Sequence, residues 1–452
     1  MFRTLPLQRA IVWSLLGGYL LLPPRTDIDL PLVPDFNKTT IPNLCALALC
    51  ILIARRRVQI WPKHRVMQAL LVLFVFGTIA TVLTNREPLI FSSIRDAGPI
   101  HIVDAQLPGL RLLDMLSILS EQMIVLIPFI LGRAFLSSES GLREMLLALF
   151  IGGLLYSVPA LFEVRLSPQL NTWIYGFFQH DFQQMMRGSG FRPLVFLPHA
   201  LWLAFFMMSA AVSAAALART AERGLRARYL AALLYLFCVL VLCKSLAPML
   251  YALTLVPLLL FSGVKLQIRL AVLLGAAATL YPMLRDYQLV PTGLLLDWAE
   301  AINPDRAQSL GFRFGNEERI LERANEKWLF GWGGWGRNLV RNPETGEIAT
   351  IPDGEWIIAF STYGWVGYVS MMGLLGGPLF LLWRAMRKLE VSRYAAALAM
   401  LLAITMVDML INAILTPFTW LTAGALLGYC EAQRKASEPA RAPPPKRLRP
   451  VL

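Results

Sequence analysis

The sequence is short of charged residues. Only 16% of its 452 residues are charged, 56% are hydrophobic, and the mean hydropathy is +0.56. A soluble chain of this size has about 25% charged residues. These values exclude a soluble globular protein and predict an integral membrane protein.

Cysteine and histidine are also scarce. The five cysteines lie in or beside apolar runs, without CxxC spacing and without companion histidines. This pattern argues against a disulfide framework and against a zinc site. The four histidines, His64, His101, His180 and His199, are scattered along the chain. We therefore expect no metal site and no cofactor.

Apolar runs recur from one end of the sequence to the other. A helix needs roughly 20 apolar residues to cross about 30 Å of hydrocarbon. The runs lie near 10–23, 41–54, 66–84, 112–132, 144–163, 194–218, 229–243, 247–263, 267–283, 356–383, 394–412 and 416–431. They predict an all-α, polytopic membrane protein with about twelve transmembrane helices and one large outer loop.

The net charge of +13 is spread over short loops between these runs. With the N-terminus inside, the basic loops 55–65, 219–228 and 384–393 fall on one side, as the positive-inside rule requires. The rule then places both termini in the cytoplasm and residues 285–355 outside. Because topology accounts for most of the charge, we expect a lipid bilayer and no nucleic acid as partner.

These patterns divide the chain into four parts. Residues 1–283 hold about nine spans, 284–355 form the outer loop with a charged helix, 356–431 hold three spans, and 432–452 form a basic, disordered cytoplasmic tail. The first apolar run lacks a small-residue cleavage site, so we expect an uncleaved helix. Residues 229–263 predict either two short helices or one re-entrant pair.

The outer loop contains a charged helix that we expect from Glu317 to Trp328, with Asn316 as its N-cap. Arg319, Arg323 and Lys327 repeat every four residues on it and form a basic stripe beside an acidic one. This stripe is either a salt-bridged solvent face or part of an anion site.

Arg313 precedes this helix between two glycines, where the backbone can approach a ligand closely. Asp353 and Glu355 stand just before the next apolar run. Partial desolvation there would raise a carboxylate pKa and suit it to accept a proton. The alternative is helix capping, because acidic residues favour helix N-termini.

A glycine-tryptophan turn occupies residues 331–336. It lacks the GK[ST] of a phosphate-binding loop, so it is not a nucleotide site. Trp332, Trp335 and the later Trp356 either sit at the membrane interface or stack on a sugar face.

A second outer loop, 165–193, is rich in aromatic residues and brings Arg187 and Arg192 to the mouth of an apolar run. Lys244 is a third isolated cation. Charges at such depth mark either a ligand path or a fixed partner. The acidic residues in other runs that could pair with Lys244 are Asp114, Glu121, Glu163 and Asp408.

Over roughly residues 185–370 the chain resembles the O-antigen ligase and polymerase superfamily. That family has an arginine, a helix and a glycine turn eighteen positions on, as Arg313 and Gly331 stand here. Asp353-Gly354 occupy the place of the family's His-Asn pair, with Gly364 and Gly367 following. The family's R-x-x-G-x-[FY] pattern is similar to the segment from Arg187 to Phe191.

The resemblance implies a bacterial inner-membrane glycosyltransferase that uses a polyprenyl-diphosphate-linked glycan at the periplasmic face. The outer loop would then be periplasmic. The family's ligase histidine is replaced by Asp353, which favours polymerisation of exopolysaccharide or O-antigen repeats. Lys244-Ser245-Leu246 stands where the family often has Ser-Arg.

The sequence-based hypothesis is therefore an inverting, metal-independent polymerase. Its diphosphate would be bound by the cations Arg187, Arg192, Lys244, Arg313 and Arg319. Asp353 would accept the proton of the attacking sugar hydroxyl, with Glu355 in reserve and Arg313 stabilising the leaving group. The alternatives are a ligase acting on a lipid or protein acceptor, a polysaccharide transporter, and a non-catalytic subunit that assembles with export proteins.

Overall fold

The computed structural model describes residues 1–25, 27–30, 33–93, 102–188, 190–302, 304–343 and 345–437. Helices dominate this part of the chain. They are α1 (Leu7–Leu21), α2 (Thr40–Leu52), α3 (Arg65–Leu83), α4 (Leu112–Phe135), α5 (Glu139–Leu166), α6 (Leu170–Tyr175), α7 (Ala200–Thr220), α8 (Arg223–Leu242), α9 (Leu246–Phe261), α10 (Val264–Asp286), α11 (Thr292–Ile302), α12 (Pro304–Asn325), α13 (Glu355–Ala385), α14 (Arg393–Asp408) and α15 (Pro417–Ser437).

Seven helices in the described ranges are long and apolar enough to cross a membrane: α3, α4, α5, α7, α8, α10 and α13. The prediction of a mostly helical chain with several helices able to span a membrane is thereby confirmed, and the figure of about twelve spans stays a prediction. Residues 229–263 belong to two separate helices, α8 and α9. The predicted tail is helical as far as Ser437, and the remainder, 438–452, lies outside the described residues.

Small residues bring neighbouring helices into close contact. A Cβ on Gly132 of α4 would lie 2.3 Å from the Leu421 carbonyl oxygen of α15, and one on Gly424 would lie 1.9 Å from the Phe129 oxygen. Helices in lipid associate through such packing, because the surrounding hydrocarbon is as apolar as the side chains. The glycines therefore fix α4 against α15.

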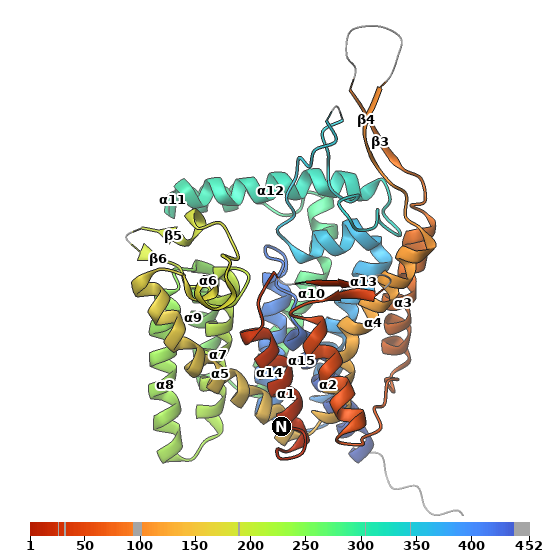
Figure 1. Cartoon of the computed structure of the whole chain (residues 1–452). Helices are drawn as coiled ribbons and strands as arrows, with labels where there is room; N and C mark the ends of the chain where they lie inside the picture. Colours follow the sequence, from red (N-terminus) through yellow and green to blue (C-terminus); the bar gives the residue numbers. More distant parts are fainter. Residues whose placement is uncertain are drawn as a thin grey trace, which may run out of the picture.

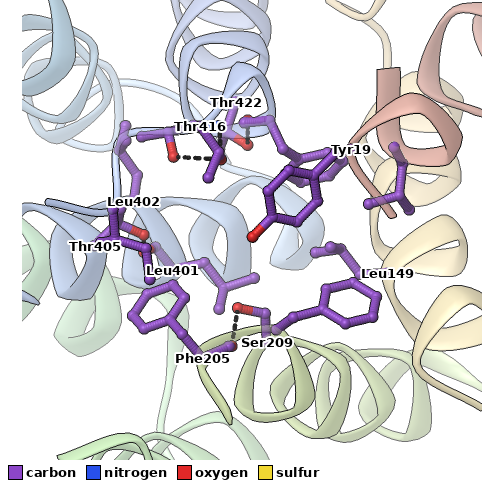
Figure 2. A pocket seen from close by; sticks show the side chains of 14 residues that line it. Tyr19, Leu149, Phe205, Ser209, Leu401, Leu402, Thr405, Thr416 and Thr422 are labelled. Atoms are coloured by element: carbon purple, nitrogen blue, oxygen red, sulfur yellow. Dashed lines mark hydrogen bonds between the residues drawn. The ribbon is translucent and has the colours of Figure 1, made fainter. Parts of the chain in front are cut away.

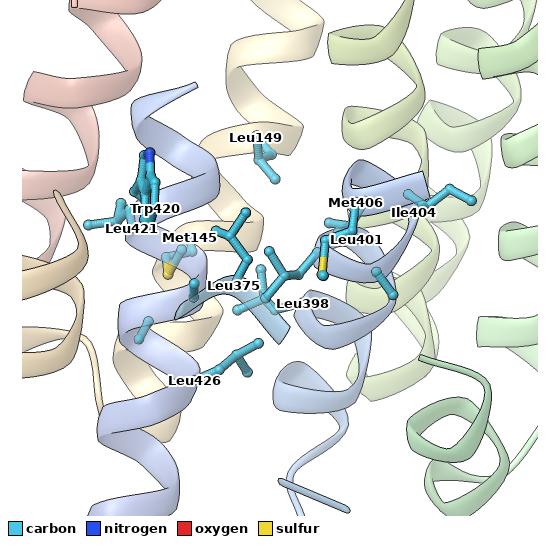
Figure 3. Close-up of a cluster of buried hydrophobic side chains, with 14 of the residues drawn as sticks. Met145, Leu149, Leu375, Leu398, Leu401, Ile404, Met406, Trp420, Leu421 and Leu426 are labelled. Atoms are coloured by element: carbon cyan, nitrogen blue, oxygen red, sulfur yellow. The ribbon is translucent and has the colours of Figure 1, made fainter. Parts of the chain in front are cut away.

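The centre of the bundle lies around α14, whose residues 395–406 are all buried. Leu398 and Leu401 of this helix cluster with Leu375 of α13 and Met145 of α5 (Figure 3). α14 is thus a core helix with little surface to offer to lipid.

α11 and α12 lie across one end of the bundle, while the N-terminus and the end of α15 lie at the opposite end (Figure 1). Three two-stranded antiparallel sheets, which the sequence did not predict, occur in the connections. They pair β1 (Ile28–Leu30) with β2 (Val33–Phe36), β3 (Leu89–Ser93) with β4 (Ile102–Leu107), and β5 (Met186–Arg187) with β6 (Gly190–Phe191). β3 and β4 project beyond α12 (Figure 1).

The charged helix of the outer loop begins earlier than the sequence predicts. Asn316 is not an N-cap: it lies inside α12, and its Nδ2 donates to the Phe312 carbonyl oxygen at 2.8 Å. Gly311 and Gly315 each weaken a helix by about 1 kcal/mol relative to alanine. Packing of α12 against α11, where Leu296 lies next to Gly311, offsets that weakness.

Candidate functional site

α12 is anchored to the bundle by a buried carboxylate, Glu317. Its Oε1 accepts from the Tyr281 hydroxyl at 3.0 Å and from Arg285 Nε at 2.9 Å. Its Oε2 accepts from Trp356 Nε1 at 3.3 Å. Burial raises the pKa of Glu317, and the Arg285 guanidinium opposes that rise. The network joins α12 to α10 and α13 and fixes the position of Arg313, one turn earlier.

Arg313 faces Asp353, in the segment that precedes α13. Arg313 Nε lies 3.7 Å from Asp353 Oδ2. One terminal nitrogen of Arg313 lies 3.4 Å from the Ile411 carbonyl oxygen and 3.5 Å from Asn412 Oδ1. Charge-assisted hydrogen bonds are usually about 2.7–2.9 Å long. Arg313 is therefore positioned by weak contacts that a stronger anionic ligand can replace.

The segment before α13 rests on the connection between α14 and α15. The Glu355 N–H donates to the Asn412 carbonyl oxygen at 3.4 Å. Gly354 is the N-cap residue of α13, and a Cβ there would lie 2.5 Å from the Leu410 carbonyl oxygen. The missing side chain at Gly354 thus allows this approach, which brings Asp353 next to Arg313.

Asp353 and Glu355 have different surroundings. Asp353 is 35% exposed and pairs with Arg313. Burial raises the pKa of Asp353, and the Arg313 charge lowers it by less. Glu355 lies in the first turn of α13, outside ion-pair distance of any described basic side chain. The N-cap residue of α13 is Gly354, which has no side chain, and Glu355 is the acidic residue in the first turn of the helix, where acidic residues are favoured.

A third carboxylate, Asp408 at the end of α14, is linked to Arg313 through Asn412. Its Oδ1 accepts from the Tyr251 hydroxyl and from Asn412 Nδ2, both at 3.1 Å. Donation by Nδ2 leaves the Asn412 Oδ1 to face Arg313. Asp408 therefore positions Asn412, a role that the sequence did not suggest.

Arg192 joins the site from the loop between α6 and α7. It is 5% exposed, and a terminal nitrogen donates to Ser245 Oγ at 2.9 Å. Its Nε has no partner among the described residues. Burial, together with the charges of Arg187 and Arg313, lowers the pKa of Arg192 to about 10, although Cys243 opposes this. Arg187 and Arg192, which are close in the sequence, therefore share one region with the distant Arg313.

Lys244 supports this region through the backbone. Its Nζ donates to the Arg187 carbonyl oxygen at 2.8 Å, and an Arg187 nitrogen lies 3.5 Å from the Lys244 carbonyl oxygen. A Cβ on Gly190 would lie 2.8 Å from Lys244 Nζ. We call Arg187, Arg192, Lys244 and Arg313 the basic cluster.

None of the four carboxylates suggested as partners of Lys244 is in an ion pair with it among the described residues, and its partner is the Arg187 carbonyl oxygen. Glu163 accepts the N–H groups of Leu170, Leu194 and Val195. Asp408 accepts from Tyr251 and Asn412. Neither Asp114 nor Glu121 forms an ion pair with Lys244.

Arg319 forms no ion pair or hydrogen bond with Asp353 among the described residues and is bonded elsewhere. It is exposed, and a terminal nitrogen donates to the Ala349 carbonyl oxygen at 3.0 Å. This bond ties α12 to the following loop. Arg319 is therefore not brought to Asp353 as Arg313 is.

The three tryptophans assigned to sugar stacking differ in exposure. Trp356 is fully buried, and Trp332 is covered by Arg323, whose guanidinium carbon lies 3.3 Å from the ring centroid. A stacking ring needs an open face. Stacking by Trp356 or Trp332 is incompatible with this packing, and only Trp335, which is 59% exposed, keeps an open ring.

The glycine-tryptophan turn closes a break in α13 at Gly364, whose φ is +63°. The Trp332 and Gly333 N–H groups donate to the carbonyl oxygens of Ser361 and Thr362, both at 2.9 Å. In return, the N–H groups of Trp365 and Val366 donate to Trp328 and Leu329, at 2.8 and 3.2 Å. We call residues 328–333 and 361–366 the glycine clasp. It satisfies backbone groups that the broken helix frees.

Two histidines that look scattered in the sequence lie together. The ring centroids of His180 and His199 are 4.6 Å apart. His199 is the N-cap residue of α7, and its Nδ1 accepts the Leu201 N–H at 2.9 Å. Ala200, next to His199, packs with Met185 and Leu194, and the Arg192 N–H donates to the Met185 carbonyl oxygen at 2.8 Å, so the pair lies in the folded loop that carries Arg192. Sequence separation alone hid this contact.

The space at the site is small. The gap lined by Arg313, Asp353, Gly354 and Ile411 has a volume of about 10 Å³. A larger cavity, about 60 Å³, lies deeper, among α1, α5, α7, α14 and α15. Its described lining has hydroxyl groups but no charged side chain, and the Tyr19 hydroxyl points into it (Figure 2). That cavity is therefore separate in chemistry from the basic cluster.

The described residues contain no group of three or more His, Cys, Asp or Glu side chains able to hold a metal ion. What the site offers is a set of cations beside the partly buried carboxylates of Asp353 and Glu355. Such a set can bind an anion and accept a proton near it. No protein-family model and no curated protein matches this chain.

Proposed function

We propose that this chain is a glycosyltransferase of the bacterial inner membrane that polymerises exopolysaccharide or O-antigen repeat units. Its substrate would be an oligosaccharide linked to polyprenyl diphosphate, used at the periplasmic face. The observation that carries the proposal is the meeting of the basic cluster with Asp353 at one end of an apolar helical bundle. The substrate has matching parts: an apolar tail, a diphosphate and sugar hydroxyls.

The reaction is a displacement at the anomeric carbon of the donor repeat unit. The acceptor hydroxyl oxygen attacks from the side opposite the diphosphate, so the configuration inverts. The bond between the anomeric carbon and the diphosphate oxygen breaks, and its electron pair stays on that oxygen. The hydroxyl proton passes to Asp353. The products are an extended glycan and polyprenyl diphosphate.

The basic cluster stabilises the leaving group. Negative charge grows on the diphosphate as the anomeric bond breaks, and fixed guanidinium groups aimed at that charge lower the barrier. Arg313 and Arg192 suit this role because their guanidinium forks can each hold two phosphate oxygens. These cations supply the charge that a divalent metal supplies in other glycosyltransferases. Lys244 holds the turn that carries Arg187.

Asp353 is the proposed base. Burial raises its pKa above the ordinary aspartate value, which increases its tendency to take a proton from a sugar hydroxyl. The adjacent Arg313 keeps part of the carboxylate ionised by favouring the charged form. The same ion pair sets the reacting hydroxyl close to the diphosphate.

Substrate binding requires a small opening of the site. A gap of about 10 Å³ holds roughly one water molecule. Arg313 would exchange its contacts of 3.4–3.7 Å for shorter bonds to phosphate oxygens. Because those contacts are long, this exchange loses little.

The proposed orientation places residues 285–355 in the periplasm and both termini in the cytoplasm. In support, the N-terminus and the end of α15 lie at the end of the bundle opposite α12 (Figure 1). The basic loops 55–65 and 219–228 favour a cytoplasmic position for that end.

The test is a reaction with the purified full-length chain in nanodiscs and a radiolabelled, polyprenyl-diphosphate-linked repeat unit. We expect a ladder of longer lipid-linked glycans and release of polyprenyl diphosphate. Transfer of a single glycan to an added lipid acceptor, without a ladder, would instead indicate the ligase alternative. An unchanged substrate under both conditions would refute glycosyl transfer.

A further inference from the structure

The His180–His199 pair has a defined proton arrangement. His180 Nδ1 accepts the Asp181 N–H at 2.7 Å, and His199 Nδ1 accepts the Leu201 N–H at 2.9 Å. A ring nitrogen that accepts a hydrogen bond carries no proton, so each neutral ring carries its proton on Nε2. Both rings therefore present an N–H donor at the far end of the side chain.

The surroundings of the pair are cationic. Burial, followed by the charge of Arg192, the neighbouring His180, Arg313 and Arg187, lowers the pKa of His199 to about 3. A positively charged environment repels metal cations and attracts anions. The two rings are thus suited to an anionic ligand.

Arg192 supplies an independent sign of a missing ligand. Its side chain is buried, yet its Nε has no acceptor among the described residues. A buried donor without a partner costs about 1–3 kcal/mol, more for a charged group. Glu163, a buried carboxylate of α5, instead accepts the N–H groups of Leu170, Leu194 and Val195. An external acceptor at Arg192 would remove that cost.

We propose that His180 and His199 form, with Arg192, a phosphate subsite separate from the reacting centre at Arg313 and Asp353. The subsite rests on the proposed function and takes the phosphate nearer to the polyprenyl chain, while Arg313 binds the phosphate nearer to the sugar. Two neutral Nε2–H donors and one guanidinium surround its oxygens. The chain should therefore select a diphosphate over a monophosphate, because only a diphosphate can contact the subsite and Arg313 at the same time.

Asparagine and glutamine variants separate the two ends of each ring. Asparagine keeps an acceptor near the Nδ1 position and lacks the distal donor; glutamine keeps a distal N–H and lacks the proximal acceptor. We therefore compare His180→Asn and His199→Asn with His180→Gln and His199→Gln. The full-length chain is placed in nanodiscs with a chelator present, and binding of geranylgeranyl diphosphate and geranylgeranyl monophosphate is measured.

The wild-type chain should bind the diphosphate at least tenfold more tightly than the monophosphate. Each asparagine variant should weaken diphosphate binding about tenfold and leave monophosphate binding unchanged, while the glutamine variants stay within about threefold of wild type. Asparagine variants that bind the diphosphate normally would show that the histidines only cap the backbone. Equal losses in the asparagine and glutamine variants would overturn the donor assignment.

Failure of the wild-type chain to bind either lipid would refute both the subsite and the proposed substrate. Normal, diphosphate-selective binding by the wild type with unaffected asparagine variants would refute the subsite alone. Equal weakening of both lipids in the asparagine variants would show a general anion contact and would also overturn the subsite. The two proposals therefore fail in distinguishable ways.

Discussion

The glycine clasp and the basic cluster differ in how well their polar groups are satisfied. In the clasp, four backbone hydrogen bonds of 2.8–3.2 Å join the turn to the broken helix. In the basic cluster, the contacts of Arg313 measure 3.4–3.7 Å and the buried Nε of Arg192 has no described partner. Satisfied groups hold a fold together, whereas unsatisfied buried groups call for an explanation. The glycine motif is therefore structural, and the isolated arginines are candidates for binding.

The largest loss of stability is expected from adding a side chain at the closely packed glycines of the glycine clasp. A Cβ on Gly331 would lie 2.4 Å from the Thr362 carbonyl group, and one on Gly364 would lie 2.4 Å from the Leu329 carbonyl group. Both glycines also have positive φ, at +70° and +63°. We expect Gly331→Ala and Gly364→Ala to lose at least about 3 kcal/mol of stability and most folded protein. Thermal unfolding and monodisperse yield in detergent measure this.

Gly334→Ala is the matched control in the same turn. A Cβ there meets nothing within 4 Å, and Gly334 does not have positive φ. This variant should fold like wild type. Equal stability of Gly331→Ala and Gly334→Ala would contradict the account of the clasp.

The next largest effect is a loss of turnover when the proposed base, Asp353, is replaced. Asp353→Asn keeps the shape of the side chain and removes the titratable group, so turnover should fall roughly a hundredfold or more with normal yield. Lipid-linked repeat units should accumulate while long polymer disappears from gels. Asp353→His, which introduces the histidine of the O-antigen ligases that the sequence resembles, should recover part of the activity.

Glu355→Gln is the control for Asp353, because Glu355 lies in the adjoining turn without an arginine partner among the described residues. It should retain near-normal turnover. Normal polymer from Asp353→Asn with none from Glu355→Gln would move the base to Glu355. Normal polymer from both would refute a carboxylate base in this pair.

Arg313 should show a smaller loss and a shift with pH. A charge-assisted bond contributes on the order of 1.5–3 kcal/mol, so Arg313→Ala should lose about tenfold to a hundredfold in rate. Arg313→Lys should lose nearly as much, because lysine lacks the planar fork. Arg341→Ala, which removes hydrogen bonds that among the described residues go to the Gly336 and Gly346 carbonyl oxygens, should leave the rate unchanged.

The pH–rate profile distinguishes an Arg313 that acts on Asp353 and the diphosphate from an Arg313 with a merely structural role. Asp353 accepts a proton only when ionised, so activity is present above its pKa and lost below it. Arg313 lowers that pKa. In Arg313→Ala the acidic limb of the pH–rate profile should therefore move to higher pH. If the acidic limb of the Arg313→Ala profile stays in place and the rates equal those of wild type, the ion pair is not part of the mechanism.

The sequence predicts the membrane class and much of the site. Apolar periodicity identifies the spanning helices because burial in lipid depends on composition over about twenty residues. Arg313 and Asp353 stand out because polar residues are rare in such a chain. Their pairing depends on Gly354 and on the carbonyl group of Leu410, which the sequence separates widely.

Three features escape sequence reasoning for physical reasons. Asn316 and Glu317 resemble a helix start, yet tertiary packing extends the helix through two glycines. Trp356 looks exposed at a helix start, yet its indole donates to Glu317 in the core. His180 and His199 meet only when the loop between α6 and α7 folds back on itself. Each case depends on contacts between distant segments, which local patterns do not contain.

The smallest effect is expected at Trp335, the one member of the tryptophan set with an open ring. Its side chain is 59% exposed, unlike those of Trp332 and Trp356. Stacking of a sugar on an exposed ring contributes roughly 1 kcal/mol, so Trp335→Ala should raise KM about fivefold and leave kcat and stability unchanged. Trp335→Phe, which keeps an aromatic face, should restore most of the affinity. If Trp335→Ala leaves KM unchanged but lowers the amount of protein inserted in membranes, the ring is an interfacial anchor and the sugar does not stack there.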